Sequence, residues 1–421
     1  MVLVPAVLAH LAHLAYLTHL AHVSSSTTCA YTQLVETTTT DSCKHSVSAL
    51  QSQRNVSHSL SVEWPTRVKV SRLVDGWLNG EVFVGTYTSQ LQTYIDTAFA
   101  PITEANYSDV SLFNSSKLNT LHLTGKYLCD KPLRLPSMFV LNGSGMTLTP
   151  ATNLSLDHVP RFAAMVMLSG VTLSAIIGGT FDASTQPPPP VNSHGYMAIS
   201  ITGAPGKNAV RHVRALANNT DASIGIHSSP HAEVSFSDVG GASGLMHGRC
   251  IWTLATSAAL VHDNYIRNCS KHSLDFDAYT SFSAAYSNTL IDHGQEGIFV
   301  EESASGNFVF NNTIHSSATG IGVYSNVVGP VANNMIIGNT IVGNGQGLSA
   351  GGVGHDPKKQ SQNNIFASNH LEANDGGGSQ VNPSHGAVSG DFWTSNNVVG
   401  SDFPYRQPLP ANYAGVTLFD P

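Results

Sequence analysis

Acidic side chains gather in one short segment of a weakly charged chain. Residues 272–302 contain Asp275, Asp277, Glu301 and Glu302, whereas charged residues make up only 11% of the 421-residue sequence. Closely spaced carboxyl groups can serve as general acid and general base, because each shifts the pKa of its neighbours. They are also the hard oxygen ligands that Ca²⁺ prefers. The segment therefore indicates proton transfer or calcium binding, provided that the fold brings these residues together.

Other side chains suited to this chemistry lie close by in the sequence. The candidate catalytic residues are Asp275, Asp277, Glu301, His272 and Tyr324. The candidate substrate-binding residues are His227, Tyr279, Glu302, Arg249, Lys271 and His293. The candidate Ca²⁺ ligands are Asp275, Asp277, Glu301 and Glu302. Arg249 and Lys271 would offset the acidic charge for an anionic substrate, although side chains in the turns of a coil are more often solvated.

A sequence repeat predicts the elements that position these residues. One short phrase recurs at intervals of 24, 24, 27 and 30 residues, centred on Asn264, Asn288, Asn312, Asn339 and Asn369. A period of this length predicts a solenoid in which each repeat stacks on the next. Asparagine beside a turn can hydrogen bond to backbone groups and to the next coil, so we expect this ladder to be structural.

A second series of phrases alternates apolar and other residues with the period of two that is typical of strands. It predicts an inner face that contains Leu274, Phe276, Ile298, Val300, Ile321, Val323, Leu348 and Ala350. It predicts an outer, exposed face that contains Asp275, Asp277, Phe299, Glu301 and Tyr324. Successive coils are then expected to form one outer column of His227, Thr253, Asp277, Glu301, Tyr324 and Gly351.

The predicted fold is all-β, a single-stranded right-handed parallel β-helix with a short N-terminal capping helix. The helix is expected at residues 89–100, where one helical face contains Leu91, Tyr94, Ile95, Ala98 and Phe99. We divide the chain into a leader segment at 1–23, an N-terminal extension at 24–84, the solenoid at 85–400 and a C-terminal tail at 401–421.

The first 23 residues are apolar apart from a threonine and four histidines, and a Ser/Thr-rich stretch follows. This pattern resembles a signal peptide, and the histidines argue against a membrane span. With eight Asn-x-Ser/Thr sequons, it predicts a secreted, extracellular glycoprotein. The five cysteines show no zinc spacing; we expect a Cys29–Cys43 disulfide and a small core residue at Cys250.

The net charge of the chain argues against nucleic acid as a partner. The net charge is −8 and the sequence pI is about 6.2, so no basic stripe is present that could bind nucleic acid. We expect a monomer.

Two stretches before the repeats resemble the pectin-lyase-like superfamily of carbohydrate-active β-helix proteins. GKYLCDKPLRLPSMFVLNGSGMTL (125–148) is similar to the superfamily's "GtYxxxxpLxLpSxvxLxGxG" coil, and IIGGTFDAS (176–184) contains its "GGtiDas" coil. The resemblance extends over about residues 85–400 and implies the β-helix fold and a polysaccharide partner. The superfamily contains lyases, epimerases, hydrolases and inactive members, so it does not determine the reaction.

Residues 272–302 resemble the catalytic coils of mannuronan C5-epimerases, in which "YGFDPH" is followed one coil later by "DGFxxDY". On that pattern Asp275 takes the place of the first catalytic aspartate and Glu301 that of the second acidic residue. Asp277 stands where the family has its histidine, and His272 where it has its tyrosine. The resemblance implies abstraction of the C5 proton of a uronate, leading to epimerisation or β-elimination, with Ca²⁺ as the candidate cofactor.

Two alternatives stay open. Paired carboxyl groups could hydrolyse a glycan as polygalacturonase-like enzymes do, and Asn219-Thr220-Asp221 matches their "NTD" strand, but no Asp-Asp pair follows. The other alternative is a non-enzymatic extracellular solenoid that binds glycan or Ca²⁺.

Overall fold

The computed structural model describes residues 67–71, 82–84, 86–99, 118–157, 159–190, 194–241, 248–325, 327, 329–352, 361–374, 381–385, 391–394, 396–399 and 417–419. All of them belong to one compact unit, Glu63–Pro421. The predicted leader (1–23) and the Cys29–Cys43 disulfide lie outside the described residues, as do most of the N-terminal extension and of the C-terminal tail.

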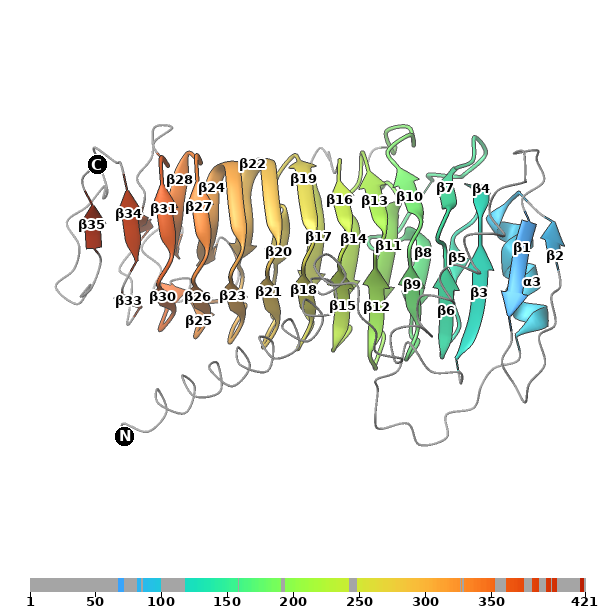
Figure 1. Cartoon of the computed structure of the whole chain (residues 1–421), viewed down its shortest axis with the longest axis horizontal. Coiled ribbons are helices and arrows are strands. Elements are labelled where there is room, and N and C mark those ends of the chain that lie inside the picture. The colour runs from blue at the N-terminus through green and yellow to red at the C-terminus, as the bar shows by residue number, and fades with distance from the viewer. Residues whose placement is uncertain are drawn as a thin grey trace, which may run out of the picture. The chain divides into compact units, whose positions relative to one another are not determined.

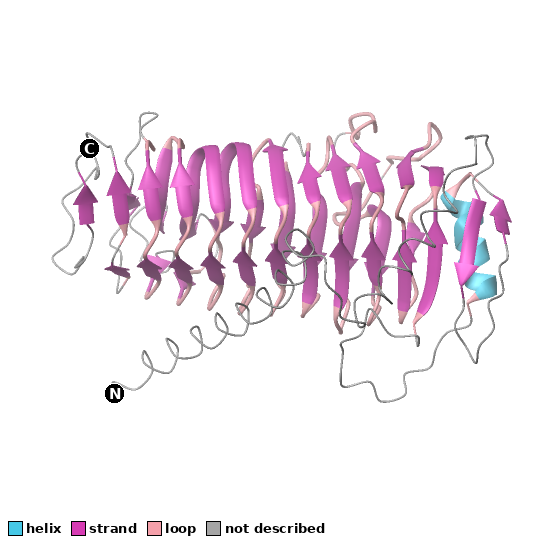
Figure 2. Cartoon of the chain, in the orientation of Figure 1, coloured by secondary structure: helices cyan, strands magenta, loops and turns pink. Residues whose placement is uncertain are grey.

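Short parallel strands, stacked coil on coil, form most of this unit (Figures 1 and 2). The 13-stranded sheet contains β1 (Arg67–Ser71), β2 (Val82–Val84), β3 (Asn119–Leu123), β6 (Phe139–Asn142), β9 (Ala175–Ile177), β12 (Asn208–Arg211), β15 (Ala232–Ser235), β18 (Leu260–His262), β21 (Ala284–Tyr286), β23 (Phe308–Phe310), β26 (Met335–Ile337), β30 (Ile365–Ala367) and β33 (Phe392–Thr394). Its strands are parallel except for β1, which pairs antiparallel with β2 and β3.

The 20-stranded sheet contains β4 (Gly125–Cys129), β5 (Leu133–Arg134), β7 (Met146–Pro150), β8 (Ala164–Ser169), β10 (Thr180–Ala183), β11 (Met197–Thr202), β13 (Arg214–Ala217), β14 (Ala222–His227), β16 (Asp238–Gly240), β17 (Arg249–Leu254), β19 (Tyr265–Cys269), β20 (Leu274–Phe276), β22 (Thr289–Val300), β24 (Thr313–Ser325), β27 (Thr340–Val342), β28 (Gln346–Gly352), β31 (His370–Glu372), β32 (Val381–His385), β34 (Asn397–Val399) and β35 (Thr417–Phe419). Strands β25 (Val331–Ala332) and β29 (Ser361–Gln362) form a separate pair.

One run of parallel strands within the larger sheet positions the candidate residues. Strands β8, β11, β14, β17, β20, β22, β24 and β28 pair in that order, and we call them the site strands. Their inner side chains form apolar ladders, such as Leu274, Ile298, Ile321 and Leu348, whose members are fully buried. The predicted inner face is therefore confirmed.

The single helix among the described residues, α3 (Thr88–Ala98), closely matches the predicted one. Leu91, Ile95 and Phe99 are buried in the main core, and Tyr94 and Ala98 pack against it. Figure 1 shows α3 at the N-terminal end of the stack, and the helix contacts β4 and β5. The helix thus covers the apolar interior of the first coil, as the capping prediction required.

The asparagine ladder is buried and continuous. Each amide nitrogen donates to the side-chain oxygen of the asparagine one coil later and to a backbone carbonyl on the preceding coil, as Asn288 does to Asn312 and Val261. Asn396 extends the ladder beyond Asn369. Two further ladders that we did not predict run through Asn307, Asn334, Asn364 and Asp391, and through Asn344 and Asn374.

Replacing Asn312 with alanine is expected to lower the free energy of unfolding by about 1–3 kcal/mol. The change removes the donor to Ala285 and the acceptor of the Asn288 backbone N–H, which leaves buried polar groups without partners. Urea unfolding would measure the loss. The control is Asn153→Ala, which alters an exposed loop asparagine; equal midpoints for the two variants would contradict a structural ladder.

Cys250 is buried as predicted, but it forms a disulfide with Cys269 that we did not predict. The two cysteines are 19 residues apart in sequence, and their Cα atoms lie 5.6 Å from each other because β17 and β19 belong to one coil. Such a spacing follows from coil geometry rather than from a short motif. Cys129 is a free, buried thiol.

Within the described ranges, no helix has the length and apolar character needed to cross a lipid bilayer.

Candidate active site

Outward residues of the site strands form three rows that run from coil to coil. Row one contains Ala222, Arg249, His272, Glu296 and Thr319. Row two contains Gly225, Trp252, Asp275, Phe299 and Gly322. Row three contains His227, Leu254, Asp277, Glu301, Tyr324 and Gly351. The chemistry-bearing side chains of different coils therefore meet on one face.

Row three corrects the predicted outer column at one position. Thr253 pairs with Phe276 rather than with Asp277, and its hydroxyl donates to the backbone oxygen of Asp275. Leu254 takes the expected place, because it pairs with His227. The error was one residue in the register, which exchanges the inner and outer faces of a strand.

The predicted exposure of this face is wrong. Asp275 is completely buried, and Asp277 and Glu301 are each 5% exposed. The side chains of Arg249, Trp252 and Phe299, from neighbouring coils, lie against these carboxyl groups and cover them. These three side chains are themselves buried. The carboxyl groups thus lie in a shielded pocket of side chains, where electrostatic interactions are stronger than at a solvated surface.

Arg249 lies at the centre of three carboxyl groups. Its Nε contacts Asp275, and its Nη2 lies 3.4 Å from Asp277 Oδ2 and 3.3 Å from Glu301 Oε1. Trp252 Nε1 donates to Asp277 Oδ2 at 2.8 Å, and the Arg249 guanidinium lies 4.6 Å from the centre of the Trp252 ring. The expectation of a solvated Arg249 in a turn is wrong: this residue begins β17 and is buried.

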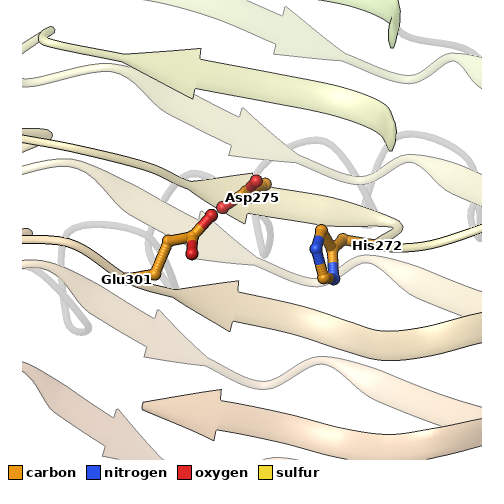
Figure 3. A group of neighbouring side chains, drawn as sticks. All are labelled: His272, Asp275 and Glu301. Carbon is orange, nitrogen blue, oxygen red and sulfur yellow. The ribbon is translucent and has the colours of Figure 1, made fainter. Parts of the chain in front are cut away.

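A second network joins His272, Glu296 and Tyr324. His272 Nδ1 lies 2.8 Å from Glu296 Oε2, and the Tyr324 hydroxyl donates to Glu296 Oε1. The Phe299 ring lies 4.9 Å from the His272 ring and 4.7 Å from the Tyr324 ring, centroid to centroid. His272 also comes within reach of Asp275 and Glu301 (Figure 3), since one ligand atom of each lies within 4.8 Å of the others. The two networks are therefore neighbours.

Trp252 is a functional candidate that we did not predict, and Glu296, which the sequence places before Gly297 near the rim of the outer column, was not among the candidate site residues. Near the start of β17 two successive residues face inward, Cys250 and Ile251, which breaks the period of two. On β22 the pairing also shifts between His293 and Glu296. A usable signal exists, because Arg249, His272 and Glu296 each stand three residues before the row-two residue of the same strand.

Burial divides the site into groups that keep a proton and a group that does not. Burial, with the charges of Asp275 and Asp277, raises the pKa of Glu301 to about 10. Burial, with Glu296 nearby, raises the pKa of Tyr324. Burial also raises the pKa of Glu296, but His272 and Tyr324 outweigh it and hold that pKa below its ordinary value. Near neutral pH, Glu301 and Tyr324 are acids, and Glu296 is a carboxylate.

This protonation state predicts how stability depends on pH. The folded protein keeps the Glu301 proton up to about pH 10, whereas the unfolded chain releases it near pH 4.5, so the stability contributed by this group decreases as the pH rises between those values. From about pH 8 to pH 9 we therefore expect the melting temperature to fall. Glu301→Gln should flatten this slope, and parallel curves for the two proteins would contradict it.

The remaining predicted residues differ in position. His227 is half-buried on row three and stacks on Phe162 at 4.5 Å, and Glu302 is half-buried next to Glu301. Lys271 is half-buried in the turn before His272, and Tyr279 is 61% exposed in the turn after β20.

His293 is buried and hydrogen bonds with Ser273, and burial lowers its pKa to about 3. Within the described residues, the side chains of Lys271, Tyr279 and His293 have no hydrogen bond or ion pair with the carboxyl groups.

Within the part of the chain that the structure describes, two groups of side chains lie close enough together to hold a metal ion. One contains His272, Asp275 and Glu301, and the other contains Asp277, Glu301 and Glu302. Arg249 contacts Asp275 of the first group and Asp277 and Glu301 of the second, so a cation in either group would compete with the guanidinium. The second group offers only oxygen atoms, all within 4.8 Å of one another, and fits Ca²⁺ better.

Comparisons with known proteins agree on the fold. A family model described as "Right handed beta helix region" matches residues 191–330. The fold is a right-handed parallel β-helix. The A-module of mannuronan C-5 epimerase AlgE4 from Azotobacter vinelandii is 14% identical, with a TM-score of 0.53 over 79% of this chain and 93% of that chain.

A mutant tailspike protein of E. coli bacteriophage HK620, solved in complex with a pentasaccharide, is 11% identical, with a TM-score of 0.55 over 79% of this chain and 61% of that chain. The β-helix protein thus spans about three fifths of the tailspike chains that it matches. Identities this low are evidence for the fold alone. No curated protein matches the sequence.

Proposed function

We propose that this β-helix protein is a polysaccharide-active enzyme that abstracts the C5 proton of a uronate residue, as an epimerase or a lyase. The observation that carries the proposal is the protonation pattern of the buried site. Glu301 keeps its proton and lies beside the buried guanidinium of Arg249. Close by, the imidazole of His272 is paired with the carboxylate of Glu296. The structural likeness to a mannuronan epimerase and to a pentasaccharide-bound tailspike supports a glycan substrate.

Removing the C5 proton of a uronate requires neutralisation of the sugar carboxylate and a base. Arg249 Nη1 has no hydrogen-bond partner among the described residues, and we propose that it donates to that carboxylate, together with the protonated Glu301. His272 is the proposed base, because Glu296 holds its imidazole at Nδ1 and stabilises the imidazolium that forms.

The two outcomes differ only in the second half of the reaction. In epimerisation an acid, Tyr324 or Glu301, returns a proton to C5 from the opposite face. In elimination the bond from C4 to its oxygen breaks, the acid protonates that oxygen, and a double bond forms between C4 and C5. Tyr324 serves as an acid rather than a base, because its raised pKa keeps the phenol protonated.

One observation favours hydrolysis as the second candidate. Asp277 and Glu301 stand on adjacent coils, Asp277 is held by Trp252 Nε1, and Glu301 keeps its proton. Two carboxyl groups, one of which keeps its proton, are the pair that glycoside hydrolysis uses. By contrast, Asp221 of the "NTD" match is held by Arg161 and His194 instead.

Ca²⁺ is a proposed cofactor. The ion would be held by Asp277, Glu301 and Glu302, which requires Glu301 to release its proton and leaves Tyr324 as the acid, and it would supply further positive charge for a uronate carboxylate. If it binds, chelation by EGTA is expected to lower the melting temperature and the activity, and added Ca²⁺ should restore both. Unchanged melting and activity after chelation would exclude this cofactor.

The test of function is proton NMR of the enzyme with alginate, pectate and a neutral glycan in D₂O. Olefinic signals would identify a lyase, C5 deuterium exchange without chain cleavage an epimerase, and new saturated reducing ends a hydrolase. If the enzyme hydrolysed the neutral glycan and changed neither alginate nor pectate, the proposal would be overturned in favour of the second candidate, a glycoside hydrolase.

We propose further that the protein is secreted as a glycosylated monomer. The Cys250–Cys269 disulfide supports this, because disulfides persist mainly in oxidising compartments. Intact mass and light scattering of the full chain, recovered from the medium of a eukaryotic host, would test it; retention inside the cells would contradict secretion.

A further inference from the structure

A second arginine lies beside the acidic site, on the segment between β7 and β8. The guanidinium carbon of Arg161 lies 4.3 Å from the centre of the Trp252 ring. The same indole contacts Arg249 at 4.6 Å, and its Nε1 donates to Asp277. Trp252 therefore joins Arg161 to the carboxyl cluster, although the two arginines are far apart in sequence.

Arg161 is held in place from two sides. Its Nε lies 3.3 Å from Oδ2 of Asp221, a carboxyl group that is 5% exposed and also pairs with His194 Nδ1 at 3.1 Å. Next to Arg161, the buried Phe162 stacks on Trp252 at 4.4 Å and on His227 at 4.5 Å. These contacts fix the orientation of the guanidinium before any ligand binds, which reduces the entropy lost on binding.

The unused part of Arg161 faces solvent. Its side chain is 44% exposed, and its known contacts use Nε and one face of the guanidinium. Among the described residues, neither terminal nitrogen has a hydrogen-bond or ion-pair partner. Burial and the charge of Arg161 together lower the pKa of His227, so this charge reaches row three. A free, oriented guanidinium edge is suited to bidentate binding of a carboxylate or a sulfate.

We propose that Arg161 binds the anionic substituent of a sugar residue adjacent to the one that reacts, and thereby selects acidic polysaccharides. The inference rests on the proposed function, since it assumes a glycan bound along the site strands. A carboxylate and a sulfate offer the same paired oxygen atoms. A neutral glycan would leave the guanidinium bonded only to water.

Calorimetric titration of the Glu301→Gln protein, which binds without turnover, tests the subsite. The probes are oligomannuronate, oligogalacturonate, a sulfated galactan oligosaccharide and a neutral cello-oligosaccharide. Adding Arg161→Ala should weaken binding of the acidic probes by at least about tenfold and leave the neutral probe unchanged. Arg161→Lys should restore part of the affinity, because it keeps the charge but loses the planar fork.

The matched control is Arg214→Ala, which removes an arginine that is 51% exposed and pairs with Asp238 on β16. The subsite would be overturned if the acidic probes bound equally well with and without Arg161, or if they bound as weakly as the neutral probe. Neither outcome would decide which reaction the enzyme catalyses, which the NMR experiment tests separately. Arg161-dependent binding of the sulfated probe alone would support the subsite and overturn uronate chemistry.

Discussion

Glu301→Gln is expected to lower kcat on the polysaccharide substrate by about 10²–10⁴-fold, the range that a general acid contributes. Glutamine has nearly the same shape but cannot transfer the proton that burial keeps on Glu301. Asp277→Asn is expected to cause a comparable loss, since it removes a carboxylate that Arg249 and Trp252 hold in position. Initial rates on the substrate identified by NMR would measure both.

The control for these variants is Glu372→Gln, which changes a glutamate on β31 whose side chain is 49% exposed and pairs with His370. Its rate should equal that of the native protein. Circular dichroism should show the same β-sheet content in all four proteins. Native rates for both Glu301→Gln and Asp277→Asn would mean that the reaction occurs elsewhere on the β-helix.

Arg249→Met is expected to destabilise the fold by about 3–5 kcal/mol at pH 7, because removing one partner leaves buried carboxyl groups without a counter-charge. Asp275 is completely buried and contacts Arg249 directly, so it carries most of this cost. Without the arginine its pKa rises further, and the variant should regain stability as the pH falls and the carboxyl groups take up protons.

Urea unfolding at pH 5 and pH 7 would measure this difference. The matched control is Arg214→Met, whose exposed ion pair with Asp238 should contribute less than about 1 kcal/mol. An Arg249→Met protein that is as stable as the control at both pH values would show that the cluster is solvated rather than buried.

The sequence repeat was enough to predict the fold and much of row three, because both depend on patterns within a strand and on the spacing between neighbouring repeats. Alternation within a strand fixes which side chains face inward, and a constant spacing between repeats fixes which strands stack, so Ile298 and Glu301 could be placed correctly from sequence. Thr253 was misplaced because the coil from Ile251 to Leu274 spans 23 residues whereas the next, from Leu274 to Ile298, spans 24, and a single-residue error reverses the face.

What sequence could not predict is how the outer face is covered. Arg249 and Glu296 stand where the alternation of inner and outer residues fails, and their contacts come from other coils. Arg161 reaches Trp252 from a segment about ninety residues earlier that belongs to no repeat. His293 was expected beside the substrate, but the irregularity in β22 buries it against Ser273 instead.

The asparagine ladder also bears on how this chain is synthesised. Each rung bonds to the coils immediately before and after it, as Asn312 does to Ala285 and Asn339. A coil leaving the ribosome can therefore dock on the preceding one without waiting for distant sequence, and α3 is made before any of them. Because Tyr324 belongs to a later coil than Arg249, the catalytic group would become complete only after β24 has been synthesised, so ribosome-bound chains that stop before β24 should be folded in part but inactive.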